Sequence, residues 1–289
     1  MAASLDRHEI FTTLRILAKD PLAVMGTLIA VAFIGTTAAV ALFGNFITPY
    51  DPNHADLNLI FLPISSKHIM GTDFLGRDIF SRVLVAAPID AQIAFTIVGV
   101  SAFVGILLGS AAGYFGGKID ETIMRVTDMF LAFPTLVLAV AVAVALGPGV
   151  GHLIEANLVV WWPVYARMAR AGSLSLRETQ FVEAARAAGL SSVAVIRKHI
   201  LPNNISPILV YATLDIGNAI LYTSVLSYLG LGAQPPQAEW GRLVFDGQVY
   251  LTRAWWVPLM PGLVILLVAL GFCLLGDALR DALDPRYRR

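Results

Sequence analysis

Five long segments of this chain carry almost no charge, and they limit most strongly how it can fold. Four contain no Asp, Glu, Lys or Arg, and the fifth contains a single carboxylate, Asp215. A helix needs about 20 apolar residues to cross the hydrocarbon core of a bilayer. Each segment is long enough, so we predict membrane-spanning helices within residues 21–50, 91–117, 129–151, 204–232 and 254–276.

A sixth segment, residues 150–169, is less apolar. Only residues 156–166 are uncharged, between Glu155 and Arg167. The alternative is a re-entrant or surface helix, but residues 167–199 would then lie across the membrane from the N-terminus. We therefore predict an all-α polytopic membrane protein with six transmembrane helices. The composition agrees, because 14% of the residues are charged, against about 25% in soluble domains.

The positive charges are distributed unevenly about these spans. Of the 20 Lys and Arg residues, only five fall on the side away from the termini: Lys67, Arg77, Arg82, Arg242 and Arg253. Loops rich in Lys and Arg stay in the cytoplasm. We therefore predict a cytoplasmic N-terminal segment (1–20), a first transmembrane helix (21–48), an extracytoplasmic loop (49–90), a five-helix core (91–280) with a cytoplasmic loop at 177–203, and a cytoplasmic tail (281–289).

The cytoplasmic loop has a local pattern of its own. Phe181, Ala184, Ala185 and Ala188 recur at helical spacing and predict one small-residue face. Gly189 is suited to the left-handed conformation that ends a helix. After it, Ser191 predicts the cap of a second short helix, and Pro202 predicts its end. The pattern indicates a helix, a tight turn and a second helix at the membrane surface.

At these residues the chain resembles a known family. The spacing is similar to that of the EAA loop, the signature of the membrane subunits of ABC importers, in which a coupling helix sits in a groove on the ATPase. The resemblance assigns ATPase coupling to Phe181, Glu183, Ala184, Ala185, Gly189, His199, Leu201 and Pro202.

Further motifs narrow the resemblance to the C-type permeases of dipeptide, oligopeptide and nickel importers, over nearly the whole chain from Pro21. They include Gly71-Thr72-Asp73, Leu75-Gly76-Arg77-Asp78, Glu239-Trp240-Gly241 and Leu279-Arg280-Asp281. The chain departs from the family at residues 86–90, where a Gly-Ala-Arg sequence with a Ser is usual. It also departs at Thr223, where an acidic residue is frequent, and at Cys273, where Asn is common. These departures leave the substrate open.

The resemblance implies a type I importer permease fold and a transport subunit that is not itself an enzyme. It implies a B-type permease as heterodimer partner, two ATPase domains on one or two chains, and an extracytoplasmic substrate-binding protein. ATP and Mg would bind to the ATPase partners, with no cofactor on this chain. The charge balance, 20 basic against 20 acidic residues, gives no reason to expect nucleic acid, and the histidine spacing gives no metal site.

The expected substrate is a dipeptide or oligopeptide. Nickel or another small solute is the alternative within the family, and a stand-alone secondary transporter or membrane enzyme is the alternative outside it. A secondary transporter would place ion-coupling groups inside the spans or show an internal repeat. The sequence has no evident repeat, and Asp215 is the one carboxylate well inside a span.

Several residues are candidates for a direct role. A charge at mid-membrane should face protein or water, so Asp215 either lines the pore and meets a peptide's amino group or is satisfied by neighbours such as Asn218. Asn157 and Trp161 are further pore candidates. In the outer loop, Asp73, Arg77 and Asp78 are candidates for sealing the pore and docking the binding protein; the alternative is packing against the partner permease.

Overall fold

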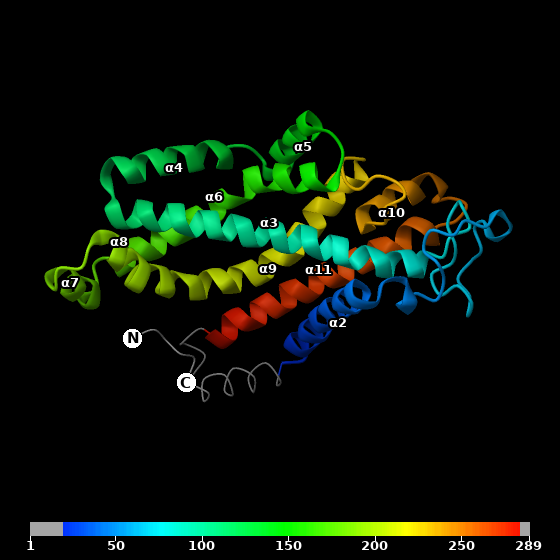
Figure 1. Cartoon of the computed structure of the whole chain (residues 1–289), viewed down its shortest axis with the longest axis horizontal. Coiled ribbons are helices and arrows are strands. Elements are labelled where there is room, and N and C mark those ends of the chain that lie inside the picture. The colour runs from blue at the N-terminus through cyan, green and yellow to red at the C-terminus, as the bar shows by residue number, and fades with distance from the viewer. Residues whose placement is uncertain (1–19, 284–289) are drawn as a thin grey trace.

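The computed structural model describes residues 20–283, which form an elongated helical bundle (Figure 1). Asp20 caps the first described helix, because its Oδ1 accepts a hydrogen bond from Leu22 N at 3.0 Å. This helix, α2, packs on the last helix, α11. The five longest helices are α2 (Pro21–Phe43), α3 (Ile79–Phe115), α6 (Val150–Leu176), α9 (Leu201–Tyr228) and α11 (Trp256–Leu283).

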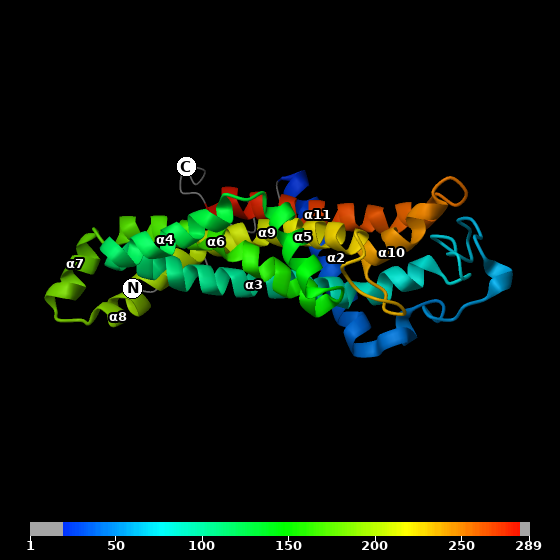
Figure 2. The ribbon, with the colours of Figure 1, turned by 90° about the horizontal axis from the view of Figure 1, so that it is seen from above.

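Three of the short helices and one long loop lie at or near the two ends of the bundle (Figures 1 and 2). One end, here called the hairpin end, carries α7 (Gln180–Ala187) and α8 (Ser192–Val195). The opposite end, here called the α10 end, carries α10 (Trp240–Gly247) and the loop between α2 and α3. The remaining helices, α4 (Gly117–Leu131) and α5 (Thr135–Leu146), both pack against α6.

Among the described residues, four continuous helices are long and apolar enough to cross a membrane: Pro21–Phe43, Ile79–Phe115, Ser192–Tyr228 and Trp256–Ala282. The helix α6 is too polar to meet that test, although it lies along α3 through the middle of the bundle (Figure 1). The all-α membrane fold is therefore confirmed, and the count of six spans stays a prediction.

The single third helix predicted at 129–151 is wrong. The chain forms α4 and α5 there, and they are bent by 86° at a short break. Pro134 explains the break, because a proline ring disfavours helical backbone at the preceding residue and supplies no N–H. The residue serves as the N-cap of α5. This part of the chain is thus a broken span or a re-entrant pair.

The second helix starts earlier than predicted, so the loop ends at Asp78 and not at residue 90. Asp78 is the N-cap of α3, with its Oδ2 accepting a hydrogen bond from Ser81 N at 2.8 Å. Pro88 lies inside α3. It removes one backbone donor, but the cap and the burial of Ile79 and Val83 already fix the first turns.

Two other boundaries differ from the predictions. The first helix ends at Phe43, and a 3₁₀ turn follows at Gly44–Ile47, because Gly44 leaves helical backbone with φ +57°. The last helix continues to Leu283, beyond the predicted end of the core at 280. Residues 1–19 of the predicted cytoplasmic segment (1–20) and residues 284–289 of the predicted tail (281–289) lie outside the described residues.

Glycines let α3 and α6 approach closely. Gly105, Gly109 and Gly113 lie one turn apart on α3, and a Cβ added at any of them would collide with α6. At Gly109 the nearest obstacle is the backbone carbonyl of Ala166, which cannot rotate away as a side chain can. Small residues at such spacing are typical of tightly packed membrane helices. This contact holds the polar helix α6 inside the bundle.

Candidate functional site

The hairpin between α7 and α8 follows the predicted helix, turn and helix. Gly189 has φ +82°, and its N–H donates to Arg186 O at 2.9 Å while Leu190 N donates to Ala185 O at 3.2 Å. These two bonds form a Schellman motif, which ends a helix with a left-handed residue. Ser191 caps α8, with its Oγ accepting a hydrogen bond from Ala194 N at 3.4 Å.

The prediction that Pro202 ends the second helix is wrong. The chain continues as one helix from Ser192 to Tyr228, with a π-helical stretch at Ile196–Ile200. Leu201 N donates to Ile196 O, five residues back, so the widened turn precedes the residue that lacks an N–H. The hairpin is therefore joined rigidly to the long helix α9.

A small apolar cluster attaches the hairpin to the bundle. Val182, Val195 and Ile200 are fully buried and pack with Tyr114 of α3. Arg186 lies 4.8 Å from the centre of the Tyr114 ring and donates from Nε to its hydroxyl at 3.2 Å. The sequence reasoning missed Val182, which it did not include in the predicted small-residue face.

The opposite face of the hairpin is uncovered. Phe181 is 44% exposed and Val193 71% exposed, and His199 lies near Phe181 with ring centres 6.1 Å apart. Ala185, His199 and Leu201 are half-buried, whereas the other coupling candidates, Glu183, Ala184, Gly189 and Pro202, are exposed. Ala185 packs on the inner apolar cluster, whereas the exposed Phe181, Glu183, Ala184 and Val193 form the uncovered surface that is here called the hairpin face.

Behind the hairpin, Asn204 joins three helices. Its Nδ2 lies 3.2 Å from Ser110 Oγ of α3, and 3.0 Å from Ala169 O and 2.7 Å from Ser173 Oγ of α6. The side chain is 2% exposed, so these bonds replace those it would make to water. Asn204 thus links the start of α9 to α3 and α6.

Asp215 lies at the centre of a second polar cluster, between α6 and α9. Its Oδ2 accepts hydrogen bonds from Trp161 Nε1 at 2.6 Å and from the Tyr165 hydroxyl at 2.7 Å. Asn218 Nδ2 lies 3.5 Å from Oδ1. The predicted candidates Asp215 and Trp161 are thus brought together. Tyr165 was missed, although it lies one helical turn after Trp161 and so on the same face.

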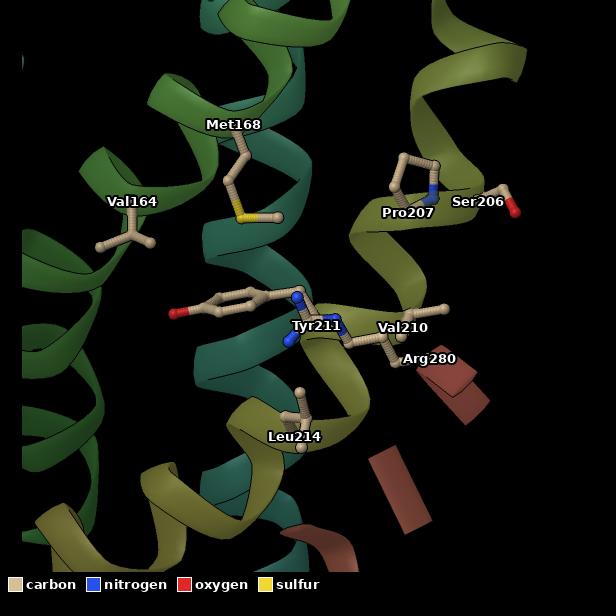
Figure 3. Close-up of a pocket in the computed structure, with 8 residues that line it drawn as sticks. All are labelled: Val164, Met168, Ser206, Pro207, Val210, Tyr211, Leu214 and Arg280. Carbon is tan, nitrogen blue, oxygen red and sulfur yellow. The ribbon is translucent and has the colours of Figure 1, made fainter. Parts of the chain in front are cut away.

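Two hollows open beside this cluster. The smaller one, about 190 Å³, has Asp215, Trp161 and Tyr222 in its lining. The larger one, about 700 Å³, lies along α6 and α9, and Figure 3 shows Met168 and Tyr211 extending into the space between these helices. The two share Val164 and Tyr211 as lining residues. The larger hollow is lined mostly by apolar side chains, and the smaller one is lined by Asp215, Asn218 and aromatic side chains as well.

Asn157 is not part of this space. It is fully buried in α6, its Nδ2 donates to Leu153 O at 2.7 Å, and it lines neither hollow. Its Oδ1 has no partner among the described residues. The structure therefore separates Asn157 from the two pore candidates with which the sequence reasoning grouped it.

The three outer-loop candidates are buried inside the loop. Asp73 Oδ2 accepts from Arg77 Nε at 2.7 Å, and Asp78 Oδ1 lies 2.9 Å from His68 Nδ1. Asp73, Arg77 and Asp78 are each at most 7% exposed. Their charges are satisfied within the chain, so they hold the shape of the loop and the start of α3.

A buried pair of carboxyl groups joins the α10 end to α3. Asp90 Oδ2 accepts from Trp240 N at 3.2 Å, and Glu239 caps α10 by accepting from Gly241 N and Arg242 N, both at 2.9 Å. The two carboxyl groups also share a hydrogen bond, which requires one proton between them. Asp90 lies within residues 86–90, where the sequence analysis noted a departure from the family that the chain resembles.

This pair predicts a pH-dependent stability. Burial raises the pKa of Glu239 above its ordinary value, so the folded protein holds a proton that the unfolded chain releases. Stability is then greatest below the ordinary glutamate pKa and falls as pH rises towards the folded pKa. The amide of Asp90→Asn can donate a hydrogen bond to Glu239 at any pH, since it needs no titratable proton. We therefore expect this variant to raise the melting temperature above neutral pH by about 3 °C.

Thermal unfolding of the purified transporter between about pH 5 and 9 measures this effect. Asp246→Asn, which breaks the pair that Asp246 makes with Arg242 at 2.8 Å on the same helix, is the control and should leave the pH profile unchanged. A profile for Asp90→Asn as steep as that of the unsubstituted protein would contradict the shared proton.

Among residues 20–283, no group of three or more His, Cys, Asp or Glu side chains is arranged to hold a metal ion. The described part of the chain thus offers a hairpin face at one end, a hydrogen-bonded carboxylate beside a hollow in the middle, and a closed loop at the other end. These are features that the sequence analysis expects of a membrane transport subunit.

Comparison with known proteins supports this class. A family model for the inner membrane component of binding-protein-dependent transport systems matches residues 105–289. The probable D,D-dipeptide transport system permease protein DdpC of Escherichia coli is 42% identical over 93% of this chain and 89% of its own length. The dipeptide transport system permease protein DppC of Alkalihalophilus pseudofirmus is 40% identical over 94% of this chain and 88% of its own.

The fold is also found among solved structures. An amino acid ABC transporter crystallised with histidines has a chain that matches with a TM-score of 0.52 and 16% identity, over 68% of this chain and 92% of that one. The chain belongs to the family of inner membrane components of binding-protein-dependent transport systems, the permease subunits of ABC transporters.

Proposed function

We propose that this chain is one of two permease subunits of an ATP-driven importer of dipeptides or oligopeptides. The observation that carries the proposal is its identity of 40% or more, over more than nine-tenths of its length, to permeases named for dipeptide transport. A B-type permease would complete the pore, two ATPase domains would supply ATP hydrolysis with Mg, and a binding protein would deliver the peptide from outside. This chain would carry no cofactor.

In this proposal the hairpin face docks onto an ATPase subunit. Phe181 and Val193 provide apolar area, and Glu183 provides a charge for basic groups at the docking groove. The continuous helix from Ser192 to Tyr228 runs from this face to Asp215 and beyond. A movement of the ATPase would therefore reach the hollows between α6 and α9 through one rigid element.

Uptake of radiolabelled dialanine into vesicles that contain the assembled transporter, its binding protein and internal ATP tests the function. We expect uptake that stops without ATP or without the ATPase subunits. Uptake by this chain without ATPase subunits would instead indicate a stand-alone secondary transporter. ATP-driven uptake of Ni²⁺ with none of dialanine would indicate the metal-importing branch of the family.

The proposed orientation puts both termini and the hairpin in the cytoplasm. We expect Ala55→Cys, exposed in the loop before α3, to react with a membrane-impermeant maleimide applied to intact cells. Val193→Cys, exposed on the hairpin face, should react only after the cells are opened. Both are made with Cys273→Ala, which removes the native thiol. Equal labelling of the two sites from outside would contradict the orientation.

A further inference from the structure

The carboxylate of Asp215 is satisfied on one side only. Both strong donors, Trp161 Nε1 and the Tyr165 hydroxyl, bind Oδ2. The other oxygen, Oδ1, has only the Asn218 amide, 3.5 Å away at the limit of a hydrogen bond. An ionised carboxylate accepts about four hydrogen bonds. Because Asp215 lines the smaller hollow, this free capacity lies beside a space that a ligand can enter.

No positive charge accompanies this carboxylate within residues 20–283. None of the ion pairs of the described chain includes Asp215, which is 4% exposed. A buried charge is strongly unfavourable unless it is paired or hydrogen-bonded. Trp161, Tyr165 and Asn218 orient the group and stabilise it, but they bring no opposite charge. The site is therefore built to hold a carboxylate and lacks a cation.

The surroundings of the carboxylate favour a cation over other ligands. Trp161 and Tyr222 pack edge to face with ring centres 5.1 Å apart, and Tyr165 and Tyr211 do so at 5.5 Å. Aromatic faces attract ammonium groups, most strongly where water is excluded. The volume of about 190 Å³ equals that of roughly six water molecules at about 30 Å³ each. This is enough for the terminal residue of a peptide.

The larger hollow is adjacent to the smaller one, because Val164 and Tyr211 line both. Its lining is mostly apolar and includes Arg280 (Figure 3). Within residues 20–283, the Arg280 side chain forms no ion pair. Of the two adjacent hollows, one thus has a carboxylate in its lining and the other a guanidinium. A peptide with free ends carries the complementary charges.

We propose that Asp215 and the aromatic side chains around it bind the α-ammonium group of a peptide during its passage through the permease. This inference rests on the proposed function and adds to it a site within the membrane. Asp215 would accept a hydrogen bond at Oδ1 from the ammonium group, Trp161 and Tyr222 would face its charge, and the remainder of the peptide would extend into the larger hollow.

Equilibrium binding to the assembled transporter in nanodiscs, without the binding protein, tests the site. The probes are radiolabelled dialanine and N-acetyl-dialanine, which differ in the charge of the amino end. We expect the unsubstituted transporter to bind dialanine about tenfold more tightly than the acetylated peptide. In Asp215→Asn, which keeps an acceptor for Trp161 and Tyr165, this preference should fall to about twofold or less.

Two further variants separate binding from folding. Glu155→Gln also removes one negative charge from the bundle, but Glu155 is exposed on α6 and lines neither hollow. It should keep the tenfold preference. Tyr222→Leu leaves the hydrogen bonds of Asp215 in place and removes one aromatic wall, so dialanine binding should weaken about threefold. This variant tests the site even if Asp215→Asn fails to assemble.

The proposal is overturned if the unsubstituted transporter binds both peptides with equal affinity. It is also overturned if Asp215→Asn and Tyr222→Leu both bind dialanine with the affinity of the unsubstituted transporter. ATP-driven dialanine uptake with the binding protein is measured in parallel. It distinguishes failure of the ammonium site from failure of the proposed importer function. Normal uptake together with an unchanged preference in the variants rejects the ammonium site alone. An absence of dialanine uptake by the unsubstituted transporter rejects the proposed function.

Discussion

Gly109→Leu is expected to abolish accumulation of the folded permease. The Cβ of the new side chain would lie 2.1 Å from the carbonyl oxygen of Ala166 on α6. The helices α3 and α6 would therefore have to separate along their whole contact. Overpacking by flexible side chains costs about 1–3 kcal/mol, and an obstacle in the backbone costs more because it cannot repack. Whole domains are stable by only about 5–15 kcal/mol. The measurement is the yield of monodisperse, membrane-extracted protein by size-exclusion chromatography.

Gly99→Leu is the matched control for this prediction. Gly99 lies on the same helix, is exposed, and has nothing within 4 Å of the position of an added Cβ. Leucine also favours helix by close to 1 kcal/mol relative to glycine. We expect a yield equal to that of the unsubstituted chain. A normal yield of Gly109→Leu would show that α3 and α6 are not in the close contact described.

Gly189→Val is expected to reduce ATP-driven peptide uptake at least tenfold while the permease still folds. Gly189 has φ +82°, and a β-branched residue is strongly disfavoured there. Nothing lies within 4 Å of an added Cβ, so the strain arises from the backbone alone. It would open the Schellman turn and tilt α7 against α8, which displaces the hairpin face from the surface that we propose it contacts.

Gly189→Asn is the control, because asparagine adopts left-handed backbone far more readily than valine. It adds a side chain of similar size at the same exposed position and should keep most of the uptake. Co-purification of the ATPase subunits, measured for both variants, reports docking directly. If Gly189→Val retains both co-purification and peptide-dependent ATP hydrolysis, the hairpin is not the coupling element.

The features that the sequence determined are those set by interactions between near neighbours. The apolar segments predict helices because a helix closes its hydrogen bonds within four residues. The hairpin turn is likewise local: Gly189 and Ser191 satisfy backbone groups at most five residues away. The sequence also indicates the family, because the spacing of motif residues such as Glu183 and Ala184 along the chain does not depend on the tertiary structure.

The tertiary structure decided the features that depend on distant contacts. Pro134 breaks a helix, whereas Pro88 and Pro202 do not, because caps, a π-helical stretch and packing compensate for their missing N–H groups. Asp215 meets Trp161 across 54 positions of sequence, and Asp90 meets Trp240 across 150. No local rule brings such groups together, since their distances depend on how whole helices pack. The sequence therefore specified the helices and the hairpin, and only their packing created the hollow beside Asp215.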